Sequence, residues 1–475
     1  MWRIRDYRRN RNIRLSGLVA ILLSTAIAIV GCAGLLRETT GSGAPDENPT
    51  TITDSSDPSS STDTTGNDDG STEPIPEPPA KGDLMASIVP ASWDGVLNPV
   101  DPEIAASVQR YSADLLMSSI DNDYNVMVSP ASVFLALAMT LNGADNETRD
   151  EMIAVLAEAG LTPAEINEFS RVWINNLEAA GAEKTDISIA NSIWFRDGFD
   201  ADIAFLQTNA DFYGAGARML DFADEGSKDI INNWVNYNTN GLIKDIIEQI
   251  DPSVVMYLIN TVYFKSEWQT PFLHQDTYEK EFNSPEGVVE HDFMNRSDML
   301  SFFEMDGADG VVLPYDDGRF AYVAVLPDEA IEPRAWLSSQ NQETLFADLR
   351  ELAAEAEAVQ GFISLPKYEA EYEDELNDEL IAMGMPSAFD SGVADFSLIN
   401  EGRRKGLYIS EVRHKTFIAV DEKGTEAAAA TSVAVAEGAI MSEKELIFNR
   451  PFFYTIIDLR NGLPLFAGIL DNPVK

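Results

Sequence analysis

One stretch near the C-terminal end of the chain, residues 420–436, constrains the fold more than any other. It reads Val-Asp-Glu-Lys-Gly-Thr-Glu-Ala-Ala-Ala-Ala-Thr-Ser-Val-Ala-Val-Ala and lies between two apolar, strand-like runs at 407–420 and 452–459. Every second residue from Thr425 is small or β-branched and uncharged, whereas Glu426 falls in the set between them. This alternation is typical of a strand with one buried face. The alanine-rich start suits an exposed loop or a helical turn equally well, because alanine is the best helix former. The stretch is therefore predicted to switch between a position outside a sheet and one within it.

Six further motifs follow one another along the chain. They are Asn125-Val-Met-Val-Ser-Pro-Ala-Ser132, Ile231-Asn-x-Trp-Val-x-x-x-Thr-x-Gly-Leu-Ile243, Leu258-Ile-Asn-Thr-Val-Tyr-Phe-Lys-Ser-Glu-Trp268, Phe362-Ile-Ser-Leu-Pro-Lys-Tyr368, Ala394-Asp-Phe-Ser397 and Phe448-Asn-Arg-Pro-Phe452. Each is similar to a signature of the serpin family and stands in that family's order. Glu422 to Thr431 in turn resembles the serpin hinge, Glu-x-Gly-Thr-Glu-Ala-Ala-Ala-x-Thr. Over roughly residues 100–475 the chain is identified as a member of this family.

The predicted elements favour an α+β fold, because helices dominate the first half and strands the second without regular alternation. Helices are predicted near 102–120, 129–142, 148–157, 163–180, 226–239, 341–354 and 373–383. Strands are predicted at 186–195, 254–265, 318–326, 362–368, 407–421, 452–459 and 463–469, the last two joined by a turn at 460–462. The length of 475 residues alone would favour two or three domains. The resemblance instead implies one domain, residues 82–475, with three β-sheets, eight to nine helices and an exposed reactive-centre loop.

The resemblance also implies a mechanism. A protease attacks the exposed loop as bait and forms an acyl-enzyme, and the cut loop then enters the sheet between the strands at 410–420 and 258–265. The hinge residues would be Glu422, Gly424, Thr425, Glu426, Ala427, Ala428, Ala429, Ala430 and Thr431. The hinge side chains that would face inward are the alternate ones from Thr425. They carry no charge and include no proline, and either would oppose entry into a sheet. We expect Thr425 to Val435 to add a central strand only after cleavage, so that Thr425→Arg would leave the intact protein as stable as wild type.

Further roles carry over from the family by position. Ser129, Ser132, Asn260 and His414 match the shutter, the polar cluster at which the sheet parts. Trp268, at the breach, and Glu422 match the top of the sheet, where insertion begins. The simpler interpretations are a satisfied buried histidine at 414, and ordinary packing of the indole beside an exposed acid.

The reactive bond can be placed only within a window. Counting fourteen residues after Gly424 gives Gly438-Ala439, whereas counting back from the Phe448 motif gives the bond after Ile440. The candidates are Glu437, Gly438, Ala439, Ile440 and Met441. Neither Lys nor Arg occurs between Gly424 and Glu443, which argues against a trypsin-like target. The window suits an elastase-like or subtilisin-like protease, and Glu437 leaves a glutamate-specific one open.

The N-terminus resembles a bacterial lipoprotein signal. A basic stretch to Arg14 precedes an apolar run, Leu15 to Val30, and then Gly31-Cys32. This pattern predicts a signal peptide over 1–31, acylation of Cys32 and a location on the outer side of a bacterial membrane; an uncleaved membrane anchor is the alternative. Residues 32–81 are rich in Ser, Thr, Asp, Gly and Pro and are expected to form a disordered tether. Cys32 is the only cysteine, so no intrachain disulfide is expected.

The net charge of −46 limits the partners. Six arginines and one aspartate give the signal segment +5, so the remainder carries about −51. Such a surface repels nucleic acid and anionic membranes. The charge is explained either as a solubility or salt adaptation or as a means to recruit a basic protease.

Enzyme functions find little support. The three histidines, His274, His291 and His414, are too scattered for a zinc pair, and the chain has neither a Gly-x-Ser-x-Gly elbow nor a Gly-Lys-Ser/Thr phosphate loop. We therefore expect a monomeric inhibitor of a serine protease, or less readily a cysteine protease, without cofactor or metal. The alternatives are a non-inhibitory binding or chaperone-like serpin and a surface lipoprotein that displays a substrate-binding domain.

Overall fold

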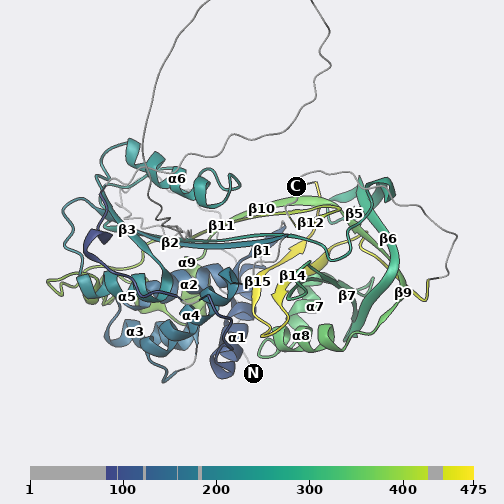
Figure 1. Ribbon diagram of the computed structural model, residues 1–475, viewed down its shortest axis with the longest axis horizontal. Helices are drawn as coiled ribbons and strands as arrows, with labels where there is room; N and C mark the ends of the chain where they lie inside the picture. The colour runs from purple at the N-terminus through teal and green to yellow at the C-terminus, as the bar shows by residue number, and fades with distance from the viewer. Residues whose placement is uncertain are drawn as a thin grey trace, which may run out of the picture.

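The computed structural model describes residues 82–93, 95–120, 125–157, 159–179, 184–425 and 442–474. Within these ranges the chain forms nine α-helices and two hydrogen-bonded sheets (Figure 1). The predicted signal peptide, Cys32, the tether, the hinge beyond Thr425 and the reactive-bond window all lie outside the described residues.

The main sheet has six strands in the order β10-β11-β12-β4-β2-β3. Their bounds are β2 Thr185–Arg196, β3 Gly216–Leu220, β4 Met256–Glu267, β10 Tyr368–Glu375, β11 Arg413–Val420 and β12 Gly424–Thr425. All neighbours are antiparallel except β2 and β3. Strands thus occupy 413–420 and 256–267, close to the predicted 410–420 and 258–265, with the short β12 between them.

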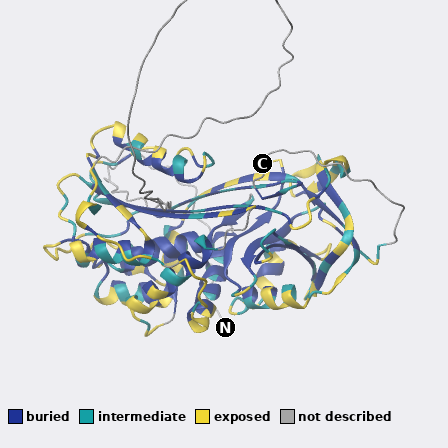
Figure 2. Ribbon diagram, viewed as in Figure 1, coloured by how far each residue is buried: buried dark blue, intermediate teal, exposed yellow. Residues whose placement is uncertain are grey.

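Helices cover both faces of the main sheet (Figure 1). On one face lies α2 (Pro130–Leu141), every residue of which is buried. On the other face lies α6 (Gly226–Asn238), whose Ile231, Trp234 and Val235 pack in a separate apolar cluster with Trp194 and Tyr257 of the sheet. The sheet is therefore buried on both sides along β2 and β4, as the dark ribbons of Figure 2 show. The prediction of a helix that crosses the sheet at 231–243 is confirmed as far as Asn238.

The second sheet has nine strands and contains the chain's C-terminal hairpin. Its strands are β1 Val126–Val128, β5 Thr277–Ser284, β6 Gly287–Met305, β7 Ala308–Pro314, β8 Phe320–Pro327, β9 Ala358–Pro366, β13 Lys444–Ile447, β14 Phe452–Asp458 and β15 Pro464–Leu470. The long β6 pairs with β5 and β9 through its first part and with β7 through its last. The resemblance implies two sheets besides the main one. Because β6 pairs with β5 and β9 as well as with β7, these two are joined into one sheet in the described residues.

The remaining helices lie on the α2 side of the main sheet or beside strands of the second sheet (Figure 1). They are α1 Pro102–Ser119, α3 Asn146–Leu156, α4 Pro163–Glu178, α5 Ile203–Tyr213, α7 Pro333–Ser339, α8 Leu345–Glu355 and α9 Asn377–Met383. Sequence signals fix several starts: the Asp101 side chain caps α1 ahead of Pro102, and Thr162 and Glu165 form a capping box on α4. Within the described ranges, no helix combines the length and the apolar character that crossing a bilayer requires.

Some predicted boundaries were wrong. The helix predicted over 373–383 begins only at Asn377, because Glu373 to Glu375 complete β10. The strand predicted over 407–421 begins at Arg413. Helices α5 and α7 and the long β6 were not predicted. The alternation of β10 leaves Glu369, Glu371 and Glu373 exposed along an edge of the main sheet.

Candidate functional site

The first hinge residues already lie inside the main sheet. Gly424 and Thr425 pair with Glu267 and Ser266 of β4, and Thr425 also pairs with Val420 of β11. A Cβ on Gly424 would lie 1.9 Å from the Ser266 carbonyl oxygen, so only glycine fits there. Thr425 is only 3% exposed. The expectation that Thr425 enters the sheet only after cleavage is therefore wrong for this residue.

A buried aromatic group holds Thr425 in place. The Tyr315 hydroxyl lies 2.6 Å from Thr425 Oγ1, and the Tyr315 ring stacks on Trp268 with centroids 4.8 Å apart. Trp268 in turn donates from Nε1 to the Asp421 carbonyl at 2.9 Å and from its backbone N–H to the Lys423 carbonyl at 2.6 Å. Tyr315 and Trp268 thus anchor three positions around the start of the hinge, Asp421 and Thr425 through their side chains and Lys423 through the Trp268 backbone. We call this set of contacts the hinge latch.

The carboxylate of Glu422 adds charged and polar contacts to the hinge latch. Its carboxylate accepts a hydrogen bond from Lys367 Nζ at 2.9 Å and lies 3.0 Å from His274 Nδ1. Burial would raise the pKa of Glu422, but the hydrogen bonds from His274 and Lys367 outweigh burial and lower it to about 2. Glu422 is only 8% exposed, so the simpler interpretation of an exposed acid is wrong. A buried carboxylate of this kind is stable only while its hydrogen-bond partners remain in place.

Beyond Thr425, no ladder joins β11 directly to β4 in the described part of the chain. A small cavity of about 30 Å³ is lined by residues 261–264 of β4 and 415–419 of β11, with Thr425 also in its wall. Ser129 and Ser132 at the start of α2 line the same cavity. The two strands between which a loop would insert are therefore separated by β12 and this cavity.

His414 and Ser129, two predicted shutter residues, contact each other. The backbone N–H of Ser129 donates to His414 Nε2 at 3.0 Å, which requires that this nitrogen carry no proton. Burial lowers the pKa of His414 to about 4, although Asp374 acts in the opposite direction. The neutral imidazole therefore joins β11 to the start of α2.

Asn260 takes a different partner. Its Nδ2 donates to Asn191 Oδ1 of β2 at 2.7 Å, and no hydrogen bond links it to His414 or to either serine. Asn260 Oδ1 and Ser129 Oγ are buried and have no hydrogen-bond partner among the described residues. Buried polar atoms are normally paired, so these two retain capacity for a further partner at the place where the sheet would part.

Sequence reasoning thus identified Trp268, Glu422 and Thr425 at the hinge and Ser129, Ser132 and His414 around the start of α2, but it missed three residues of the hinge latch. Tyr315 lies just beyond β7, and Lys367 and His274 come from other connections. Lys367 lies within the Phe362–Tyr368 motif and could have been considered as a partner for Glu422. Tyr315 and His274 carry no local signal, because only the tertiary fold brings them to the hinge.

Within the described residues, no group of three or more His, Cys, Asp and Glu side chains could hold a metal ion. The site therefore consists of a strand position, a latch of hydrogen bonds and aromatic rings, and a polar cluster. Its parts hold a segment of backbone, Gly424–Thr425, between two strands.

The sequence model of the family described as "Serpin (serine protease inhibitor)" matches residues 106–473. The chain belongs to the serpin family. It is 33% identical over 399 residues to an uncharacterized serpin-like protein of Thermococcus kodakarensis. The aligned residues cover 82% of this chain and 91% of that protein.

Among solved structures, the fold resembles the native state of the thermophilic serpin tengpin. That similarity has a TM-score of 0.75 at 36% identity and covers 82% of this chain and all of tengpin's. The latent state of tengpin gives a lower TM-score of 0.68 at 35% identity, covering 79% of this chain and 99% of that one. The described residues thus match the native arrangement better than the latent one.

Proposed function

We propose that this serpin inhibits a serine protease by suicide-substrate loop insertion, in which the cleaved loop enters the main sheet and traps the acyl-enzyme. The single observation that carries the proposal is the position of β12. The hinge begins as a strand between β11 and β4, and the described residues contain no ladder that would close the sheet beyond it. Strand addition to such a gap is a known mode of peptide binding, for which serpin loop insertion is itself a general example.

The composition of the hinge supports insertion beyond Thr425. The positions that continue its alternation are Ala427, Ala429, Thr431, Val433 and Val435, all small or β-branched. Side chains of this kind can be buried between strands without leaving a charge or a clash. The unpaired Ser129 Oγ and Asn260 Oδ1 offer acceptors near the path of an entering strand. Residues with these properties favour an inhibitor over a non-inhibitory binding module.

The sequence of the reactive-bond window, Glu437 to Met441, favours an elastase-like, subtilisin-like or glutamate-specific target over a trypsin-like one. The test is to mix the purified chain with one protease of each kind and analyse the products by denaturing gel electrophoresis. We expect a 1:1 complex, stable in detergent, whose mass is near the sum of both partners. Cleavage of the loop by all three proteases without such a complex would contradict the proposal and favour a binding module.

We further propose that the chain is anchored by a lipid on Cys32 outside a bacterial membrane. Support comes from the basic and apolar segments that precede Gly31-Cys32. Replacing Cys32 by Ala should abolish labelling with a radioactive fatty acid and release the protein from the membrane fraction. Full-length wild-type protein in the soluble cytoplasm would contradict this proposal without affecting the inhibitor mechanism.

A further inference from the structure

The loop between η4 (Ser397–Ile399) and β11 carries the only run of three basic residues in the chain, Arg403-Arg404-Lys405. Residues 401–412 belong to no helix or strand, and residues 401–406 are all exposed. Ion pairs with Asp200 and Asp202 place the loop beside the start of α5, which lies at the opposite end of the main sheet from β12 (Figure 1). Loop insertion gives these basic residues no role.

The backbone of this loop is loosely held around its basic run. Arg403 has φ +48°, a left-handed conformation that residues with a side chain seldom adopt. Gly406 has φ +107°, and no atom lies within 4 Å of the position that its Cβ would take. In the described part of the chain, residues 405–408 make no backbone hydrogen bond. Extending the loop would therefore break no ladder and would release Arg403 from an unfavourable conformation.

The three basic side chains differ in how firmly they are held. Each pairs with a carboxylate, in the pairs Arg403–Asp202, Arg404–Asp200 and Lys405–Asp395. The Lys405 pair is 2.5 Å long and the side chain of Asp395 is only 4% exposed, so this contact is firm. The Arg404 pair spans 3.9 Å between side chains that are 65% and 55% exposed. Because exposed ion pairs contribute little to stability, Arg404 is the basic side chain most easily released from the loop.

Two hydrogen bonds hold the backbone of Arg404, and both involve the side chain of Asn400. The Arg404 N–H donates to Asn400 Oδ1 at 2.9 Å, and Asn400 Nδ2 donates to the Arg404 carbonyl at 3.0 Å. A serine protease places the carbonyl oxygen of the bond that it cuts in its oxyanion hole, so these contacts must open before cleavage. Opening them is a local change at one residue, whereas cleavage within a helix or a strand requires a longer segment to unfold.

We propose that Arg404 is a cleavage site for a protease that cuts after basic residues, and that the cut molecule stays folded as two fragments. Water adds to the Arg404 carbonyl carbon, the bond to the Lys405 nitrogen breaks, and a carboxylate and an ammonium group are left at the two new ends. Exposed loops are the preferred places for such cuts. The reactive-bond window contains neither Lys nor Arg, so proteases of two different specificities would act on this chain at distant places.

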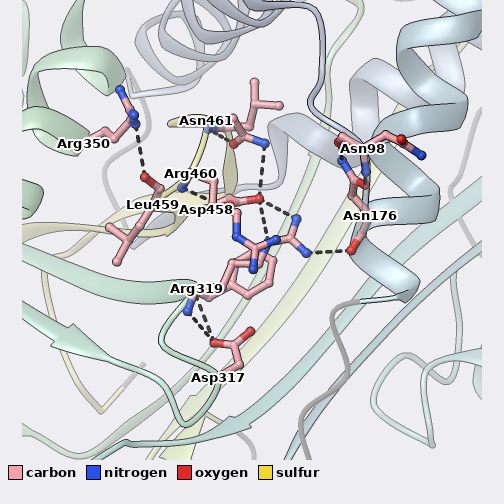
Figure 3. A network of polar contacts seen from close by, with 11 residues as sticks. Asn98, Asn176, Asp317, Arg319, Arg350, Asp458, Leu459, Arg460 and Asn461 are labelled. Atoms are coloured by element: carbon pink, nitrogen blue, oxygen red, sulfur yellow. Dashed lines mark hydrogen bonds and ion pairs between the residues drawn. The ribbon is translucent and has the colours of Figure 1, made fainter. Parts of the chain in front are cut away.

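Buried contacts would hold the two fragments together. The C-terminal fragment contributes β14 and β15, every residue of which is buried, to pairs with β8 and β1. It also contributes the fully buried Asp458, which accepts from Arg319 Nε and Nη2 at 2.9 and 2.5 Å (Figure 3). Arg350 of α8 donates from Nε to the Leu459 carbonyl at 3.1 Å (Figure 3). Separation would break a buried ion pair and two strand pairings, so we expect it only in denaturant.

The cut should lower the stability of the molecule. Unfolding of the cut protein releases two chains instead of one, so its equilibrium depends on protein concentration. The unfolding temperature of the cut protein should therefore be lower than that of the uncut protein and should rise with concentration. In the proposed inhibitory mechanism, cleavage of the reactive loop raises the unfolding temperature instead. One calorimetric measurement therefore distinguishes the two cuts.

The test is limited digestion of the full-length chain by trypsin under native conditions. The first cut within residues 82–475 is identified by intact mass and N-terminal sequencing. We expect a C-terminal fragment that begins at Lys405, elutes with the rest of the chain in gel filtration and separates from it in urea. A first cut elsewhere in this range, or a fragment that elutes alone without urea, would overturn the proposal. Neither outcome bears on the inhibitor mechanism, because the reactive loop is not a substrate in this assay.

Variants assign the cut to one bond. R404Q should slow the appearance of the fragment by about tenfold or more, because the S1 pocket of trypsin selects a basic side chain. K244Q is the matched control, since Lys244 is also exposed and outside helices and strands, but its neighbours Ile243 and Ile246 are buried in the apolar cluster between α6 and the main sheet. K244Q should be cut at the wild-type rate. An unchanged rate in R404Q, or equal slowing in both variants, would reject Arg404 as the site.

Discussion

Among single residues, Tyr315 has the clearest energetic role at the hinge. Its hydroxyl is the hydrogen-bond partner of the buried Thr425 Oγ1, so Tyr315→Phe would leave that oxygen unpaired. We expect the intact protein to lose about 1–3 kcal/mol in the free energy of unfolding, measured by urea denaturation. The matched control is Tyr111→Phe, because the Tyr111 hydroxyl is buried without a hydrogen-bond partner among the described residues. That variant should be as stable as the wild type, and an equal loss in both would argue against the hinge latch.

His414 predicts a pH dependence of stability. Its pKa is about 4 in the folded protein against 6.5 for an ordinary histidine, so between these values the unfolded chain binds more protons. Stability should therefore fall as the pH drops from about 6.5 to about 4. His414→Gln, which has no such titration, should show a smaller slope in that window. His291→Gln on β6 of the second sheet is the control, and an unchanged slope in His414→Gln would contradict the assignment.

At the scale of elements, the sequence was most informative where a local signal and the final packing agree. Asp101 with Pro102 marks the start of α1, and the 460–462 turn joins β14 to β15 as predicted. The sequence failed where burial comes from distant contacts. The first part of β6 alternates exposed and half-buried side chains without an apolar run, so only its pairing with β5 and β9 defines it.

In the candidate site, too, local sequence signals must be distinguished from contacts between residues that are distant in the chain. Gly424 and the small residues after it are local signals from which the hinge was predicted, and of that predicted hinge the structure describes only Glu422 to Thr425. The hinge latch depends on Tyr315, Lys367 and His274, which come from three connections and meet only in the folded molecule. Sequence reasoning placed Thr425 outside the sheet before cleavage because Tyr315, its hydrogen-bond partner, is more than a hundred positions away in the chain.

The two faces of the hinge provide a direct test of insertion. Because Thr425 is already buried, Thr425→Arg would destabilise the intact protein as well, contrary to the expectation from sequence. Ala427→Arg is the better change, as the alternation assigns Ala427 to the inward set and Ala428 to the outward one. Ala427→Arg should be cleaved as a substrate with little covalent complex, because a guanidinium resists burial between strands. Ala428→Arg should form the complex normally, and equal yields from both variants would contradict insertion in this register.

On the scale of the whole molecule, insertion should raise stability. Cleavage would let residues up to Val435 add a central strand with about ten ladder positions, each worth about 1 kcal/mol net. Calorimetry should therefore show a much higher unfolding temperature for the cleaved protein than for the intact one, although a peptide bond has been lost. Cleaved Ala427→Arg should show a smaller rise. A cleaved wild type that unfolds at or below the temperature of the intact protein would exclude insertion.

The two-residue strand β12 affects the entropic cost of adding a further strand to the main sheet. Bringing a free segment to a distant docking position carries an entropic cost that grows with the logarithm of the intervening length, and it is incurred at the first contact. Every later contact adjoins one already made and closes only a minimal loop. With Gly424 and Thr425 seated between β11 and β4, this nucleation step is complete before any protease arrives. Under the proposed insertion mechanism, entry of the remaining residues would be a propagation reaction, and its rate would depend on successive local steps rather than on a search.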